Sequence, residues 1–148
     1  MVRSANIWLI AGGILSLVAA ALHVAVILGG PAWYRFFGAG ERMARAAAKG
    51  SAMPTLVTIG IATVLAIWAA YAFSGAGLIG KLPLLRLGLI VISAIYLLRG
   101  LALFAMLAFT PARVDAFWVW SSLIVLVYGL AYAVGTWTAW PLLSKANV

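Results

Sequence analysis

The chain has 148 residues, of which 67% are hydrophobic and only 8% are charged, and its mean hydropathy is +1.18. A soluble domain carries about 25% charged residues and needs a polar exterior. The composition therefore excludes an ordinary soluble domain and predicts that lipid surrounds most side chains. The net charge of +8 comes from ten Lys and Arg against two acids, Glu41 and Asp115. The lack of cysteine excludes disulfides and thiolate chemistry.

Four apolar stretches are long enough to cross the hydrocarbon layer, which takes about 20 residues in a helix. They cover residues of about 7–28, 52–73, 84–109 and 117–140, with Pro or Gly near their ends. Only helices or closed barrels satisfy the backbone in lipid, and no alternation of period two is present. The sequence predicts an all-α polytopic membrane protein: a single domain, 1–148, with four transmembrane helices in an antiparallel bundle.

The connection between the first two spans, residues 31–51, is basic. It contains Arg35, Arg42, Arg45 and Lys49 around Glu41. The last three basic residues are spaced three and then four apart, which places them on one face of a short helix. One interpretation is an interfacial helix that binds anionic headgroups. The other is a solvated connector whose charges only set the topology.

Basic residues also bear on the orientation of the chain. One basic residue precedes the first span and four follow it, whereas the totals on the two sides of the membrane are almost equal. The positive-inside rule therefore favours a cytoplasmic connection 31–51. We expect a multi-pass protein of the cell (plasma or inner) membrane.

Arg99 lies in the middle of the third span. It is roughly 15 Å from the end of that span at the rise of an α-helix, close to the bilayer midplane. An arginine at that depth costs at least about 2.5 kcal/mol on insertion scales. We expect it to meet polar partners inside the bundle, with Tyr96 one turn before it. Arg99 then either binds an anionic ligand or is a structural arginine satisfied by carbonyls and hydroxyls.

Other polar residues fall on the same half of the membrane as Arg99. Tyr128 and Thr63 are at a similar depth, roughly 16 Å below the boundary, and His23 is about 8–9 Å below it. Thr58, Ser121 and Ser122 lie near the level of His23. This distribution predicts a cavity open to that side with Arg99 at its floor. Each residue also has a plain role, since a buried His or Tyr commonly fills space and bonds a carbonyl.

The function predicted from these residues is binding of a lipid or anionic amphiphile in an intramembrane cavity, or service as an accessory subunit of a membrane complex. An oligomeric anion channel or transporter is an alternative. No catalytic set or phosphate loop is present, and one His with four Met predicts no metal or other cofactor. The expected partners are membrane lipids, other membrane subunits or a second copy of the chain. No basic stretch is long enough to predict nucleic-acid binding.

A membrane-embedded enzyme with a lipophilic substrate is the other alternative. The stretch Glu41-Arg42-Met43-Ala44-Arg45-Ala46 follows the first span and resembles the glutathione-using MAPEG family over about a dozen residues. The Asn and second Glu of that family's motif are absent, and Lys49-Gly50-Ser51-Ala52 occupies the region. The resemblance implies glutathione-transferase-like chemistry, in which Arg99 or Arg113 stabilises a thiolate or oxyanion. Whether the chain is an enzyme stays open.

Overall fold

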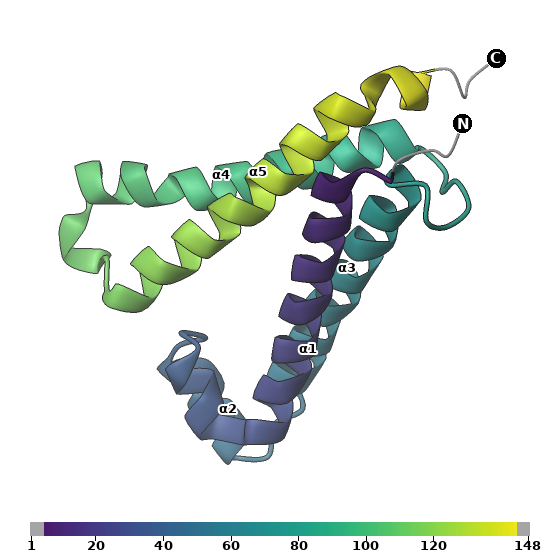
Figure 1. Cartoon of the computed structure of the whole chain (residues 1–148). Helices are drawn as coiled ribbons and strands as arrows, with labels where there is room; N and C mark the ends of the chain where they lie inside the picture. The colour runs from purple at the N-terminus through teal and green to yellow at the C-terminus, as the bar shows by residue number, and fades with distance from the viewer. Residues whose placement is uncertain (1–4, 145–148) are drawn as a thin grey trace. The chain divides into compact units, whose positions relative to one another are not determined.

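The computed structural model describes residues 5–144, which form five α-helices and no strand. These are α1 (Ile7–Phe36), α2 (Glu41–Ala48), α3 (Met53–Gly75), α4 (Leu85–Phe109) and α5 (Ala116–Ser144), with a 3-10 turn, η1 (Pro111–Arg113), before α5 (Figure 1). Four of them, α1, α3, α4 and α5, are long and apolar enough to cross a membrane. The predictions of an all-α chain and of four candidate spans are confirmed, and they indicate a multi-pass membrane protein.

Two helices are longer than we expected from the positions of proline and glycine. We expected α1 to end at Leu28, but it continues to Phe36 across a kink at Gly30, which has φ 66 and ψ −152. Pro31 follows the kink as the first residue of a new helical turn, where its missing N–H costs nothing. Similarly, α5 continues through Pro141 to Ser144. Pro141 removes one i→i−4 backbone hydrogen bond, and only three helical residues follow it.

Contacts along the chain divide it into two compact units, which are described separately. One comprises Leu17–Ile67, and the other comprises the chain up to Ser16 together with Trp68 onward. The predicted antiparallel bundle, the single domain and the interfacial position of α2 therefore stay predictions.

The Leu17–Ile67 unit is built around Tyr34. Tyr34 is 2% exposed and lies in a cluster with Val26 of α1 and the fully buried Ala44 of α2. Phe37, Met43 and Ala47 pack against this cluster. The Tyr34 hydroxyl lies 3.3 Å from the hydroxyl of Thr58 on α3. The apolar face of α2 thus holds this short helix against α1 and leaves Arg42 and Arg45 exposed.

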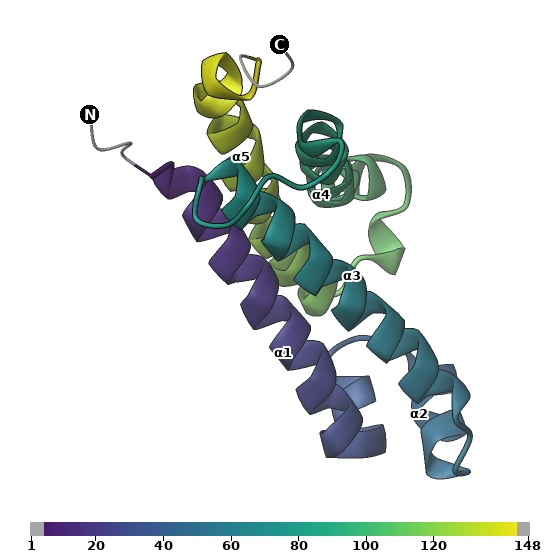
Figure 2. The ribbon, with the colours of Figure 1, turned by 90° about the vertical axis from the view of Figure 1, so that its right-hand side faces the viewer.

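In the second unit, α4, which is seen nearly along its axis in Figure 2, packs on α5. Glycines line the contact between these two helices. A Cβ on Gly100 would lie 2.8 Å from Cα of Leu126, and a Cβ on Gly129 would lie 2.9 Å from the backbone N of Leu97. Atoms that close overlap, so only glycine permits this backbone approach. Small residues of this kind favour packing between membrane helices, where the hydrophobic effect contributes little.

The start of α1 packs on α5 in the same way. Asn6 caps α1 by accepting a hydrogen bond from the backbone N–H of Leu9 at 3.1 Å. Its side-chain amide donates to the carbonyl of Gly135 at 3.0 Å and to the hydroxyl of Thr138 at 2.9 Å. A Cβ on Gly135 would lie 2.9 Å from the backbone N of Leu9. One side chain therefore both begins α1 and fixes its position on α5.

A chain of buried hydroxyls connects four helices of this unit. The Ser16 hydroxyl of α1 lies 2.9 Å from the hydroxyls of both Tyr96 on α4 and Tyr132 on α5. Tyr132 also donates to the carbonyl of Trp68 on α3 at 3.0 Å. A carbonyl can only accept, so the single proton of Tyr132 is committed to it and Ser16 must donate to Tyr132. Tyr96 then donates to Ser16, which leaves each hydroxyl donating once.

We expect Gly100→Ala to destabilise the protein by about 1–3 kcal/mol, because the added methyl group meets the backbone of Leu126. Gly60→Ala is the matched control: Gly60 is also helical, but nothing lies within 4 Å of a Cβ there. That control should be neutral or slightly stabilising, because Ala is the better helix former. Thermal unfolding in mild detergent measures both. Equal effects of the two substitutions would contradict the close approach.

The direction of the hydroxyl chain predicts unequal effects of two substitutions. Ser16→Ala leaves the proton of Tyr96 without an acceptor and should cost about 1–3 kcal/mol. Tyr96→Phe removes only the first donor and should cost less. Ser93→Ala is the control, because this buried hydroxyl bonds only the Leu89 carbonyl of its own helix. Unfolding in detergent should rank the losses as Ser16 first, Tyr96 second and Ser93 last, and a larger loss for Tyr96 than for Ser16 would refute the direction.

Candidate functional site

Arg99 of α4 reaches across to the beginning of α5. Its Nη1 donates to the hydroxyl of Ser122 at 2.8 Å, and its Nη2 makes a long contact with the hydroxyl of Ser121 at 3.5 Å. The guanidinium carbon lies 4.3 Å from the centroid of the Trp118 ring, in the geometry of a cation–π interaction. The side chain is half-buried. Arg99 therefore does meet polar partners, and they are hydroxyls and an aromatic face.

The first turn of α5 positions these partners. Asp115 accepts a hydrogen bond from the backbone N–H of Trp118 at 2.7 Å, which caps the helix. Ser121 donates to the carbonyl of Trp118 at 3.3 Å, so its oxygen stays available as an acceptor for Arg99. The cap fixes the start of the helix, and the helix then presents Trp118, Ser121 and Ser122 to the guanidinium.

The guanidinium keeps both charge and hydrogen-bonding capacity. It has five N–H donors, and only two nitrogens of Arg99 bond to protein within the part that the structure describes. The chain has two acids: Asp115 caps α5 and Glu41 pairs with Arg35 and Arg45. No ion pair of Arg99 is found among residues 5–144. The site therefore carries an uncompensated positive charge on an apolar helix pair.

Arg99 extends along α4 towards the α4–α5 connection. Its Cα is roughly 15 Å from the end of α4, whereas Trp118 and Ser122 are roughly 3 and 9 Å from the start of α5 by helical rise. We expected the charge to stay near the midplane. The long side chain instead carries the guanidinium towards the end of the helix pair, as arginines in membrane helices commonly do. The expected cavity with Arg99 at its floor stays a prediction.

The aromatic rings of Tyr96 and Tyr128 contact each other. Their ring centroids are 5.6 Å apart with the planes at 71°. Tyr96 is 5% exposed, and it also contacts Trp68 and Tyr132 edge-on or tilted. Its hydroxyl is occupied by Ser16. These two side chains are therefore parts of the packed centre, and their predicted role in binding stays untested.

Thr63 and His23 lie in the Leu17–Ile67 unit and bond to their own helices. Thr63 is exposed and donates to the carbonyl of Ile59 at 2.9 Å. His23 is half-buried, and its Nδ1 lies 2.7 Å from the carbonyl oxygen of Ala19. Both contacts satisfy a polar group inside an apolar helix, which is the plain role that the sequence left open for them.

The basic connection contains a small ion-pair network. Arg35 binds Glu41 with Nε and Nη2 at 2.8 and 3.0 Å, and Arg45 binds the same carboxylate at 3.0 Å. Arg42, Arg45 and Lys49 line one shallow hollow on α2, so they do share a face. Arg42 and Lys49 have no ion pair within the described chain. Their charge remains available to an anionic surface.

The sequence placed Ser121 and Ser122 on the same half of the membrane as Arg99, but it did not identify Trp118 or the members of the hydroxyl chain. Trp118 was not connected with Arg99, although a tryptophan ring is a favourable partner for an arginine inside a membrane. Ser16 and Tyr132 were not selected, because a lone Ser or Tyr in an apolar helix gives no sign of what it faces. Among residues 5–144 there is also no group of three or more His, Asp or Glu that could hold a metal ion.

Four helices able to span a membrane, one of which carries Arg99 without an ion pair in the described chain, indicate a polytopic helical membrane protein. Comparison with known protein families, with curated proteins and with solved structures gave no match. What the chain does is therefore inferred from its own residues.

The carboxyl of Glu41 gives a pH test of the connection. Hydrogen bonds from Arg35 and then Arg45 lower its pKa from the ordinary 4.5 to about 2. Because the folded pKa is depressed, the stabilisation is present above pH 4.5 and is lost as the pH falls through about 2. Carbon NMR of the labelled side chain should place its titration near pH 2.

Substitutions of the two arginines separate their contributions to this pKa. Arg35→Gln should raise the pKa of Glu41 more than Arg45→Gln does, because Arg35 contributes two hydrogen bonds and Arg45 one. Added salt should weaken both effects, since all three groups are exposed. Titration of Glu41 near its ordinary pKa of 4.5 in the unsubstituted protein would contradict the ion-pair network.

Proposed function

We propose that the protein binds an anionic amphiphile of the membrane, such as a lipid with a negatively charged headgroup, through Arg99. The observation that carries the proposal is the guanidinium itself: it is half-buried, keeps unused donors and has no acidic partner among the described residues. A phosphate or carboxylate accepts such donors in pairs, and the hydrogen bonds are strengthened by charge.

Charge favours an anion at this position. A guanidinium placed among apolar residues loses hydration that two hydroxyls and one ring replace only in part. An anionic headgroup supplies both the missing acceptors and the missing charge. The ring of Trp118 covers one face of the guanidinium, so the ligand approaches the edge of the guanidinium that carries the N–H groups.

Apolar surface beside Arg99 favours an amphiphile over a small soluble anion. Ile95, one turn before Arg99 on the same face of α4, is 44% exposed, and Leu98 next to Arg99 is 69% exposed. Side chains of this kind on a membrane helix face hydrocarbon tails. A ligand with an anionic head at Arg99 can lay its chain along this surface.

The accessory-subunit function makes use of the same features. A partner helix that carries an acid could pair with Arg99, as intramembrane charges commonly pair with one another. The same helix would cover the exposed apolar side chains beside Arg99. As further parts of the proposal, α2 lies at the membrane surface with Arg42, Arg45 and Lys49 towards headgroups, and residues 31–51 face the cytoplasm of a cell or inner membrane.

The test uses nanodiscs of phosphatidylcholine that contain a photoreactive phosphatidylglycerol, with crosslinks mapped by peptide mass spectrometry. We expect crosslinks near Trp118 and Ser122, and Arg99→Leu should reduce them about fivefold or more, because one Lys or Arg near anionic lipid contributes about 1 kcal/mol. Arg113→Leu is the control, since it removes the same charge from an exposed residue of η1.

Two outcomes count against lipid binding at Arg99. Equal crosslinking by the Arg99→Leu and Arg113→Leu proteins would show that the guanidinium does not select the headgroup. A protein subunit that copurifies with the unsubstituted chain, and is lost from Arg99→Leu, would replace lipid binding by the accessory function. Circular dichroism checks that the leucine variant keeps its helices.

A further inference from the structure

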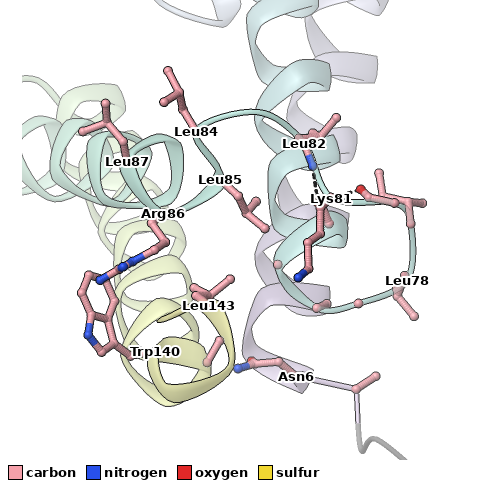
Figure 3. A pocket seen from close by; sticks show the side chains of 18 of the residues that line it. Asn6, Leu78, Lys81, Leu82, Leu84, Leu85, Arg86, Leu87, Trp140 and Leu143 are labelled. Atoms are coloured by element: carbon pink, nitrogen blue, oxygen red, sulfur yellow. Dashed lines mark hydrogen bonds between the residues drawn. The ribbon is translucent and has the colours of Figure 1, made fainter. Parts of the chain in front are cut away.

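The second unit contains a cavity at the other end of α4 and α5, away from Arg99. Its volume is about 920 Å³, within the range of about 300–1,000 Å³ that is typical of ligand pockets. It lies between Asn6 before α1, the segment that follows α3, the beginning of α4 and the end of α5 (Figure 3). None of the residues chosen from the sequence lines it.

Hydrogen bonds hold the connecting segment that forms one wall of the cavity. The hydroxyl of Ser74 donates to the carbonyl of Gly80 at 2.9 Å and accepts from the backbone N–H of Leu82 at 3.1 Å. Tyr71 donates to the carbonyl of Pro83 at 3.0 Å. Asn6, which also lines the cavity, is fixed by its bonds to α5. The cavity is therefore formed by anchored residues before any ligand enters.

Two cations line this cavity. The guanidinium carbon of Arg86 lies 4.3 Å from the ring centroid of Trp140, and this pair occupies one side of the opening (Figure 3). Lys81 extends from the connecting segment on the other side. The sequence has no acid between Glu41 and Asp115, and neither cation has an ion pair within residues 5–144. The cavity thus has a positive charge at its mouth.

The rest of the lining is mainly apolar. Leu78, Leu82, Leu85, Ile90 and Leu143 contribute to it, and at its rim Leu84 is 74% exposed. Leu84 has φ 52 and ψ 31, the left-handed conformation that side chains with a Cβ disfavour. Strain of this kind concentrates at ligand sites, where it holds a side chain in a required place. Here it presents an exposed leucine next to the two cations.

We infer that this cavity binds a single phospholipid of the adjacent leaflet that carries an anionic phosphate headgroup. The phosphate lies between Lys81 and Arg86, and the acyl chains leave along Leu84 and Leu87 of α4. Arg86 can bind phosphate oxygens with two parallel N–H groups while its face stays on Trp140. An apolar wall beside two cations matches a molecule that joins a charged head to hydrocarbon, and matches a free anion poorly.

This inference is independent of the site at Arg99. The two sites use different arginines of α4 and different tryptophans of α5, so either site can be correct without the other. A mapped crosslink identifies which site a lipid occupies, whereas a count of bound lipids does not.

The experiment again uses photoreactive phosphatidylglycerol in phosphatidylcholine nanodiscs, followed by pepsin digestion and mapping. Crosslinks are expected in residues 78–87 and 139–143. Lys81→Gln and Arg86→Gln should each reduce them about fivefold, and together more. Lys49→Gln with Arg113→Gln is the matched control, because it removes the same charge from residues outside the cavity. Arg99→Leu should leave these crosslinks unchanged.

Three results would overturn the inference. One is equal crosslinking in the cavity variants and the control. Another is equal crosslinking by a photoreactive phosphatidylcholine, which shows contact with surrounding lipid without recognition of charge. The last is displacement by millimolar inorganic phosphate, which identifies a free anion as the ligand. Arg86→Lys is the control for misfolding. It keeps the positive charge, so it should retain more crosslinking than Arg86→Gln.

Discussion

The hydroxyl of Ser16 is the contact on which the second unit depends. In hydrocarbon there is little hydrophobic gain from bringing helices together, so hydrogen bonds and close packing determine which faces meet. Ser16 accepts from Tyr96 and donates to Tyr132, and Tyr132 continues to the carbonyl of Trp68. These bonds fix the rotation of α1, α4 and α5 about their axes. That rotation then decides what every other polar side chain of the unit can reach.

One consequence is that an arginine of α4 stacks on a tryptophan of α5 towards each end of the helix pair. Arg86 lies on Trp140 and Arg99 on Trp118, both at 4.3 Å. The two arginines are separated by roughly 20 Å of helical rise, and the side chain of Arg99 extends the separation further. This spacing approaches the roughly 30 Å of the hydrocarbon layer. Each guanidinium is thus carried towards one end of the helix pair, where our proposals place the headgroups.

The helices could be predicted from the sequence, but their faces could not. Lipid forces the backbone into long apolar helices, so hydropathy and length were enough to find four spans. The rotation of each helix about its own axis has no comparable signal in the sequence. Tyr128 seemed a neighbour of Arg99 by depth, yet the guanidinium bonds Ser122, six residues earlier and on another face of α5. Helical rise predicts the depth of a residue in the membrane. Which side chain it contacts depends on how the helices pack.

Both proposed sites follow from one shortage of negative charge. Of the two acids, Glu41 is shared by Arg35 and Arg45, and Asp115 is committed to the cap of α5. Arg86 and Arg99 therefore lack an acidic partner within the described chain. A cation next to lipid gains most from an anion that comes with its own hydrocarbon, because head and chain are both satisfied at once. We therefore expect the missing negative charge to come from the molecules that surround the helices.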